Sequence, residues 1–198
     1  MTSRKLVQFF MNTLLIGAII TLIVGLAFDV NEYTQFIKHG EYIKVGLGLF
    51  GLLLKGLLYS VYSQMGFFAY LTIHRFGLNF FKSIRLWNIV QSILIIFALG
   101  DLIYLRYIEN AHGKGSIFPY LIPSLVLLVV GIFVAFYKAK ATNKDAFVPS
   151  MFFMTVVTIV EWIPALRINQ QLEMFYMLTT LLVCNSYQLL TLHKTLKS

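Results

Sequence analysis

Apolar runs of about 20 residues recur along this whole chain, and each is long enough to cross a hydrocarbon layer of about 30 Å as an α-helix. The runs are continuously apolar and do not alternate with a period of two, which argues against a membrane β-barrel. Only 12% of the 198 residues are charged and 59% are hydrophobic, whereas a soluble domain usually has about 25% charged residues. Too little polar surface remains to cover a water-soluble globule. The sequence therefore predicts an all-α membrane protein.

Six transmembrane helices packed as a bundle are expected. The predicted spans are residues 6–28, 45–73, 86–104, 117–137, 147–166 and 172–192. The first run should remain as an anchor, because its apolar part exceeds the roughly 7–15 residues of a signal peptide and no small-x-small cleavage site follows it. No long polar segment separates the runs, so residues 1–198 are expected to form a single polytopic membrane domain. The lone Cys184 lies in an apolar run and provides neither a disulfide framework nor metal-ligand spacing.

Positive charge is unevenly shared between alternate connections of these spans. The two ends, with the second and fourth connections, hold ten of the 16 Lys and Arg residues and one acid, Asp145. The other connections hold five basic and five acidic residues. The positive-inside rule therefore predicts a multi-pass protein of the cell membrane with both termini in the cytoplasm. This asymmetry, with attraction to anionic lipid of the inner leaflet, accounts for the net charge of +8, so nucleic acid is not an expected partner.

Ionisable side chains inside the spans are candidates for a functional site. Three are present, Lys55, Asp101 and Glu161, and the predicted orientation places all of them toward the extracellular side, where Arg106 and Arg167 lie just outside the spans. A charge at a helix centre costs about 2.5–3.5 kcal/mol on insertion scales, so such residues usually face the bundle interior or a cavity. These five residues form a candidate polar network. Asp101 and Lys55, taken singly, are also explained as shallow, hydrated or snorkelling side chains.

Glu161 is the strongest candidate of this network because it lies within the apolar run VVTIVEWIPALRINQ (156–170). Pro164 cannot donate a hydrogen bond to the carbonyl four residues earlier, so it is expected to break the helix one turn above Glu161. The opened turn, the carboxylate and Trp162 would then line a pocket. The alternative is a buried structural ion pair between Glu161 and a cation of the network, either Lys55 or Arg167.

Uncharged polar residues occupy the inner half of the predicted bundle, and the simplest interpretation is that they join neighbouring helices by hydrogen bonds. They are Gln64, Asn88, Gln91, Asn185 and Gln188. On the first span, Gly17, Thr21 and Gly25 form a stripe of small residues. Such a stripe favours a close helix contact, either within this chain or with a partner protein.

The second predicted connection, residues 75–85, mixes aromatic rings with positive charge. Its candidate contact residues are Arg75, Phe76, Phe80, Lys82 and Arg85. The segment is either a short amphipathic piece in the membrane interface or a docking surface for another protein.

Catalysis finds little support in the sequence. The chain has no Gly-x-Ser-x-Gly, no His-Glu-x-x-His and no phosphate-binding loop. All four histidines fall in predicted connections or at helix ends, away from the membrane carboxylates. An enzyme is therefore not expected, and no cofactor or metal is implied.

Five stretches of the chain resemble a known family. They are GFFAYLTIHRFGLNFF (66–81), RLWNIVQ (85–91), LGDLIYLRY (99–107), AFVPSMFFMTVVTIVEWIPALR (146–167) and LLVCNSYQLLTLHK (181–194). They look like the KinB-signalling pathway activation protein family (KbaA) of spore-forming bacteria, and the resemblance extends over about residues 1–195, with the same length and six-span plan. The family consists of integral membrane proteins needed to activate a membrane sensor histidine kinase, KinB, which feeds phosphate into the sporulation phosphorelay. It has no catalytic motif, so no residue here inherits a role.

The resemblance implies a non-catalytic activator that associates with the spans of a KinB-type sensor kinase. Such a protein would shift the kinase toward one conformational state by binding that state better. A small transporter or ligand-sensing protein, with a polar site around Glu161, is the competing class. A third interpretation is a scaffold that changes the abundance of the kinase and not its activity.

Overall fold

The computed structural model describes residues 3–111 and 116–197, and this part of the chain is helical almost throughout, without a strand. Its elements are α1 (Ser3–Phe28), α2 (Val30–Lys38), α3 (Tyr42–Phe81), α4 (Ile84–Ala111), α5 (Phe118–Ala141), the 3-10 helix η1 (Lys144–Ala146), α6 (Phe147–Phe152), the π-helix η2 (Phe153–Val157), α7 (Thr158–Ile168) and α8 (Gln171–Lys197). Within it, six helical segments are long and apolar enough to cross a membrane. They are Arg4–Phe28, Tyr42–Phe81, Ile84–Ile108, Tyr120–Ala141, Lys144–Ile168 and Gln171–His193. The predictions of an all-α chain and of six candidate spans are therefore confirmed.

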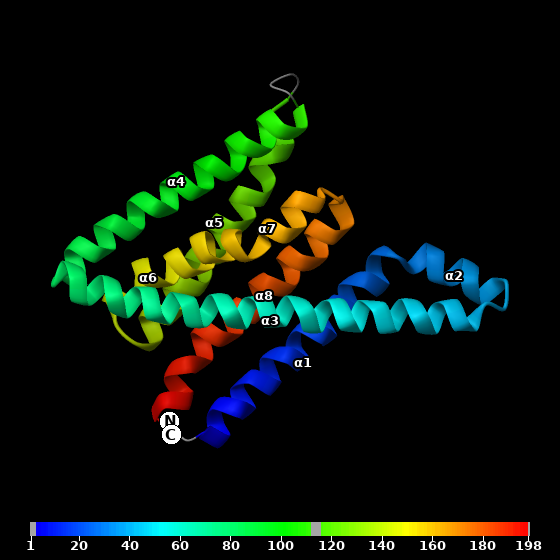
Figure 1. The fold of residues 1–198 in the computed structure, drawn as a ribbon, viewed down its shortest axis with the longest axis horizontal. Coiled ribbons are helices and arrows are strands. Elements are labelled where there is room, and N and C mark those ends of the chain that lie inside the picture. Colours follow the sequence, from blue (N-terminus) through cyan, green and yellow to red (C-terminus); the bar gives the residue numbers. More distant parts are fainter. Residues whose placement is uncertain (1–2, 112–115, 198) are drawn as a thin grey trace.

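Helices α1, α3 and α8 pack against one another, and Figure 1 shows α1 and α8 running side by side to the same end of the molecule. The α1–α3 contact is close because it is made by glycines: a Cβ atom on Gly56 would lie 2.7 Å from the carbonyl oxygen of Gly17. One turn along α1, Thr21 Oγ1 lies 2.8 Å from Thr180 Oγ1 of α8. The small-residue stripe of the first span therefore packs within this chain.

The long helix α3 continues well beyond the predicted span 45–73. It runs to Phe81 and ends at Lys82, whose φ of 52° is left-handed, and α4 begins two residues later. Gly77 is the weakest helix former near this end, and it allows Trp87 of α4 to pack closely, since a Cβ there would lie 2.5 Å from the indole. Residues 75–81 are thus the last turns of α3. Most of the stretch expected as a connection between two spans is therefore helical and continuous with α3.

A short helix that the apolar pattern does not predict, α2, precedes α3. It packs on α3 through Tyr33, for which Gly48 leaves room: a Cβ on Gly48 would lie 2.8 Å from the phenol ring. Burial, together with the neighbouring charges of Asp29 and Glu32, raises the pKa of Tyr33. In Figure 1, α2 lies far from the end at which α1 begins and α8 finishes.

The fifth candidate span is irregular, but not at the predicted position. A π-helix occupies Phe153–Val157, and Thr158 Oγ1 donates to the carbonyl of Phe153 at 3.3 Å. The helix then continues through Pro164 to Ile168. The expected break at Pro164 is therefore wrong. A proline removes one hydrogen bond, but its fixed φ of about −65° is itself helical, so a packed membrane helix can contain it.

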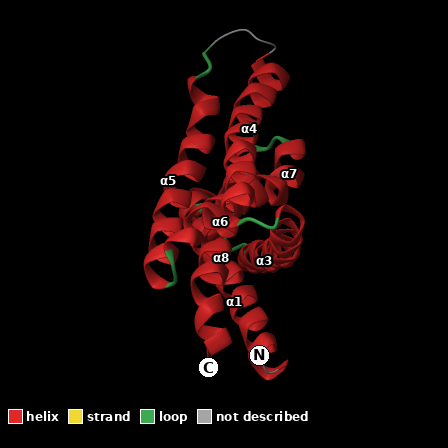
Figure 2. Ribbon diagram, turned by 90° about the vertical axis from the view of Figure 1, so that its left-hand side faces the viewer, coloured by secondary structure: helices red, strands yellow, loops and turns green. Residues whose placement is uncertain are grey.

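Burial is uneven across the six spans. In the most apolar stretch of the fifth and sixth spans, 61% and 56% of the residues are buried, whereas only 17% are buried in the corresponding stretch of α4. Figure 2 shows α4 and α5 standing side by side, with their upper ends beyond the turn between α7 and α8 and with the ends of α1 and α8 below. The core therefore lies along η2, α7 and α8, and α4 presents a long outward face.

Candidate functional site

A buried polar cluster surrounds Glu161 where α3, α7 and α8 meet. We call its members the Glu161 cluster: Ser63 from α3, Thr158 and Glu161 from α7, and Asn185 and Gln188 from α8. Glu161 is 7% exposed, and the other four are fully buried or nearly so. The π-helix immediately before α7 rotates the helix by adding a residue to one turn, and π-turns of this kind are frequent at functional sites.

Asn185 is the centre of the cluster. Its Nδ2 donates to Glu161 Oε2 at 2.7 Å and to Thr158 Oγ1 at 2.9 Å. Its Oδ1 accepts from Ser63 Oγ at 2.6 Å, and Ser63 Oγ in turn accepts from Gln188 Nε2 at 3.1 Å. Both protons of the Asn185 amide are therefore used. The network joins three helices through one side chain.

Two acceptor oxygens complete the cluster. Glu161 Oε1 and Gln188 Oε1 are buried and receive no hydrogen bond from the described residues. Glu161 Oε1 lies against α3 at Gly66, where a Cβ atom would be only 1.8 Å away. Glycine at position 66 therefore makes room for the carboxyl group. A buried acceptor without a donor costs about 1–3 kcal/mol, so this carboxyl group is held at an energetic cost.

The structure does not bring the five residues of the candidate polar network together. Lys55 pairs with Glu173 in the first turn of α8, and Tyr59 donates to the other oxygen of Glu173 at 2.7 Å. The partner of Lys55 is therefore Glu173 and not Glu161. A carboxylate in the first turn of a helix, such as Glu173 in α8, also interacts favourably with the helix dipole. The expectation of a Glu161–Lys55 pair is therefore wrong.

The remaining network residues lie apart from Glu161. Arg167 is exposed, so a buried pair with Glu161 is also excluded. Arg106 Nη2 donates to Asn169 Oδ1 at 3.5 Å, and its guanidinium lies 6.0 Å from the ring centre of Trp162. Asp101 is partly buried on α4 and makes no ion pair with any residue that the structure describes.

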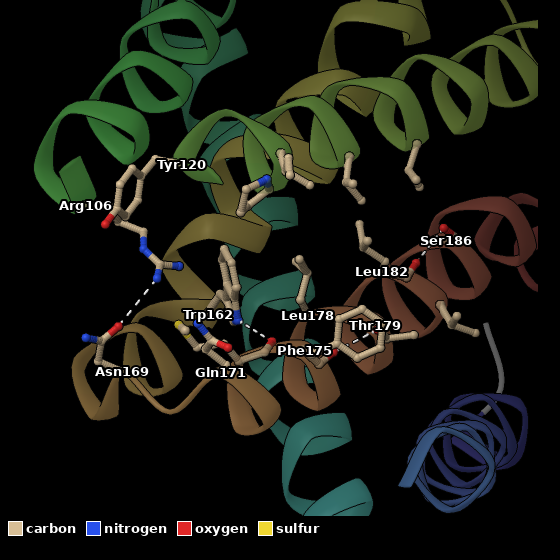
Figure 3. A pocket seen from close by; sticks show the side chains of 16 residues that line it. Arg106, Tyr120, Trp162, Asn169, Gln171, Phe175, Leu178, Thr179, Leu182 and Ser186 are labelled. Carbon is tan, nitrogen blue, oxygen red and sulfur yellow. Dashed lines mark hydrogen bonds between the residues drawn. The ribbon is translucent and has the colours of Figure 1, made fainter. Parts of the chain in front are cut away.

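A cavity of about 810 Å³ lies between α5 and α8, close to the α7–α8 turn (Figure 3). Trp162 forms part of its floor and donates from Nε1 to the carbonyl of Met174 at 2.9 Å, which joins α7 to α8. Glu161 is not among the lining residues. The expectation that Glu161 and Trp162 line one pocket is wrong, because adjacent residues on a helix point about 100° apart.

Comparison with known proteins places this chain in a family. A family model described as KinB-signalling pathway activation in sporulation (KbaA) matches residues 17–195. A protein of Bacillus subtilis (strain 168), named KinB-signaling pathway activation protein, is 41% identical over 194 residues, which cover 98% of this chain and 98% of that protein. The chain belongs to the KbaA family. No solved structure matches it.

The resemblance seen in the sequence is thereby confirmed. The KbaA family is named for activation of a signalling pathway and not for a class of enzyme. The stretches that resemble it supply most of the buried cluster: 146–167 carries Thr158 and Glu161, and 181–194 carries Asn185 and Gln188. In the described residues, no group of three His, Cys, Asp or Glu side chains is placed to hold a metal ion.

The end of α3 carries the candidate contact residues on its surface. Arg75, Phe76, Phe80 and Lys82 of this end, and Arg85 on α4, are all exposed. The rings of Phe76 and Phe80 stack at 6.2 Å between centres. The helical hairpin behind them is fixed by Trp87 of α4, whose Nε1 donates to His74 Nδ1 at 3.1 Å. We call these five exposed residues the α3 tip.

One buried cation was not expected to have a structural role. Lys138 is 8% exposed, and its Nζ donates to the carbonyl of Leu189 at 2.6 Å, which ties α5 to the last part of α8. In the sequence, Lys138 closes an apolar run and looks like one more topological charge beside Lys140 and Lys144. No local pattern separates a charge that folds back onto a neighbouring helix from one that faces water.

Proposed function

We propose that this chain is a single polytopic domain of the cell membrane, with both termini cytoplasmic, and that it activates a membrane sensor histidine kinase of the KinB type upstream of the sporulation phosphorelay. The observation that carries the proposal is the match over 98% of the chain to a protein named for activation of KinB signalling. The six candidate spans support a membrane location. The proposed mechanism is non-catalytic helix–helix association.

Association activates a kinase only if the activator prefers one kinase state. A difference of about 1.4 kcal/mol between its affinities for the active and inactive states changes the ratio of those states tenfold. Packing of a few side chains between membrane helices, with hydrogen bonds of about 0.6–2 kcal/mol each, supplies free energies of that size. No chemical step by this chain is required.

Two surfaces suit such association. The outward face of α4 is long and apolar, and its exposed residues include Ile89, Ile93 and Ile96. The α3 tip adds stacked aromatic rings beside positive charge at the end that the charge asymmetry places in the cytoplasm. A kinase helix that lies along α4 would continue toward the α3 tip, where the signalling helix of the kinase leaves the membrane.

The decisive experiment measures the kinase with and without this chain in the same membrane. Both the abundance of the kinase and its autophosphorylation per molecule are quantified. An activator raises autophosphorylation at constant abundance, whereas a scaffold raises abundance alone. Absence of co-purification and of any change in autophosphorylation would contradict direct activation.

Variants of the α3 tip sharpen this experiment. Phe76→Ala with Phe80→Ala should lower autophosphorylation about tenfold, the ratio that corresponds to about 1.4 kcal/mol of lost differential binding. The matched control is Phe136→Ala, since Phe136 on α5 is 60% exposed against 70% and 69% for the two tip residues. An equal loss in the control would show that exposed rings matter only for folding or insertion.

The second candidate is a ligand-sensing or transport role for the Glu161 cluster. The buried, unpaired oxygens of Glu161 and Gln188 favour it, because they would accept hydrogen bonds from a proton-carrying or polar solute. Glu161→Gln keeps the shape of the side chain. If the cluster senses a solute, this change should abolish signalling at unchanged protein abundance. If the cluster only joins helices, signalling should be unchanged or should fall together with abundance.

A further inference from the structure

The cavity between α5 and α8 has no part in the proposed kinase contact, and its lining changes character along its length. At one end lie polar side chains from the ends of four spans, among them Arg106, Tyr120, Asn169 and Gln171 (Figure 3). These residues stand where candidate spans begin or finish, so they lie at the height of the membrane surface on the α7–α8 side. The opposite end reaches Ser186, deeper along α8.

Between these ends the cavity is apolar. Pro123 and Val126 line it from α5, and Leu178 and Leu182 line it from α8. Leu178 and Leu182 are each 8% exposed and form the floor, whereas Ile122 and Phe175, at 59% and 44%, stand at its edges. The cavity is therefore closed by protein behind and bordered in front by side chains that face lipid.

The described residues that line this cavity carry charge of one sign. Arg106 is the single cation in the lining, and no Asp or Glu is present among the described residues that line it. The guanidinium is held at the polar end by Trp162 and Asn169. An arginine fork in this position matches the geometry of a phosphate or carboxylate group.

We propose that the cavity binds an anionic phospholipid, with the phosphate group at Arg106 and one acyl chain along the apolar floor toward Ser186. The second chain would lie in the bilayer beyond Ile122 and Phe175. In the proposed topology this lipid belongs to the outer leaflet. Burial of an acyl chain contributes about 0.8 kcal/mol per CH₂ when the alternative is water. Against bulk lipid that gain disappears, so the headgroup contact with Arg106 decides which lipid is bound.

The volume of the cavity suits an acyl chain. It measures about 810 Å³, which lies within the range of about 300–1,000 Å³ for small-molecule sites. The stretch of α8 that lines it, from Gln171 to Ser186, rises about 22 Å.

The test uses the full-length protein, without any kinase, in nanodiscs of phosphatidylcholine that contain a small fraction of photoactivatable phosphatidylglycerol. We expect cross-links concentrated on residues 122–130 and 178–186, and at least a threefold loss of this labelling with Arg106→Gln. Photoactivatable phosphatidylcholine carries the same phosphate group but no net charge, so it should label the cavity more weakly and lose less labelling with Arg106→Gln. A photoactivatable fatty acid, which carries a carboxylate and no phosphate, tests whether the phosphate is needed.

Two variants that fill the cavity make the test independent of the headgroup. Leu182→Trp should abolish the cavity cross-links, and Thr179→Phe, at the edge, should do so with less strain on the fold. The matched control is Ile93→Trp on the lipid-facing side of α4, which should leave the cavity labelling unchanged. Labelling spread equally over α4 and the cavity, or untouched by both filling variants in folded protein, would overturn the proposal. Since no kinase is present, this outcome leaves the kinase proposal unaffected.

Discussion

Gly66 of α3 and Glu161 of α7 share one small volume, because a Cβ atom at position 66 would lie 1.8 Å from Glu161 Oε1 and 2.6 Å from its Cδ. The carboxyl group is buried, so it has little room to move aside. The glycine thus sets how closely α3 and α7 approach each other, and the orientation of Glu161 toward Asn185 depends on it.

The first prediction is that Gly66→Ala destabilises the bundle. Overpacking of this kind typically costs about 1–3 kcal/mol, which should appear as a lower thermal midpoint in detergent. Gly51→Ala is the matched control, because it lies on the same helix with nothing within 4 Å of the added Cβ. Alanine in an open helical position stabilises by about 0.5–1 kcal/mol relative to glycine. Equal midpoints for the two variants would contradict the Gly66–Glu161 contact.

The second prediction concerns Asn185. Asn185→Ala removes the donor to Glu161 and to Thr158 and the acceptor of Ser63, all in the buried cluster. Each buried polar group left unsatisfied costs about 1–3 kcal/mol, so abundance in the membrane should fall sharply. Asn12→Ala is the comparison, since the hydrogen bond that Asn12 Nδ2 donates to Tyr187 Oη at 3.2 Å is only partly buried. A smaller effect at Asn185 than at Asn12 would show that the cluster does not hold the helices together.

The third prediction is that Lys55 and Glu173 couple energetically. The two side chains are 43% and 22% exposed, so the pair is partly screened. A double-mutant cycle with Lys55→Met and Glu173→Gln should give a coupling of about 0.5–1 kcal/mol, as for pairs of this exposure. The pair Lys44–Glu41, which is 58% and 39% exposed, should couple less. Additive effects of Lys55→Met and Glu173→Gln would mean that the contact contributes no stability.

Glu161 and its partner Asn185 show which part of this site could be predicted from the sequence. The six spans follow from chain composition, because a backbone in lipid must satisfy its own hydrogen bonds and helices do so locally. The partner of Glu161 depends on which helices are neighbours. Asn185 lies 24 residues further along, and the orientation and depth estimates assigned it to the opposite half of the bundle.

The π-helix and the ion pair show the same limit. The π-helix at Phe153–Val157 has no local sequence signature. A proline is recognised directly in the sequence, and for that reason the break was predicted at Pro164, where the helix in fact continues. Lys55 and Glu173 are each visible as charges near the membrane, but their pairing requires α3 to cross the start of α8. Spacing along the chain carries no information about such crossings.

The fourth prediction separates two lysines of one connection. Lys138→Met and Lys140→Met each remove one positive charge, so they change the charge asymmetry equally. Lys138 is buried and donates to the Leu189 carbonyl, whereas Lys140 is exposed. Lys138→Met should lower the thermal midpoint and loosen the end of α8, and Lys140→Met should not. An equal decrease in thermal midpoint for both variants would mean that the lost charge impairs membrane insertion, and would contradict a role for the α5–α8 contact.

The fifth prediction is the orientation of the bundle. Alkaline phosphatase, which is active outside the cell, should be active when inserted after Gly40, in the exposed turn between α2 and α3, and inactive when fused after Ser198. A fluorescent protein that matures only in the cytoplasm should give the reverse pattern. The reason is the excess of Lys and Arg in the ends and in the second and fourth connections. Replacing Arg75, Lys82 and Arg85 by Gln removes three of those charges and should give a mixed population. Phosphatase activity at Ser198 would show that the bundle has the opposite orientation. The α3 tip would then lie outside the cell, where it could not contact the signalling helix of the kinase, and the Arg106 cavity would open to the inner leaflet.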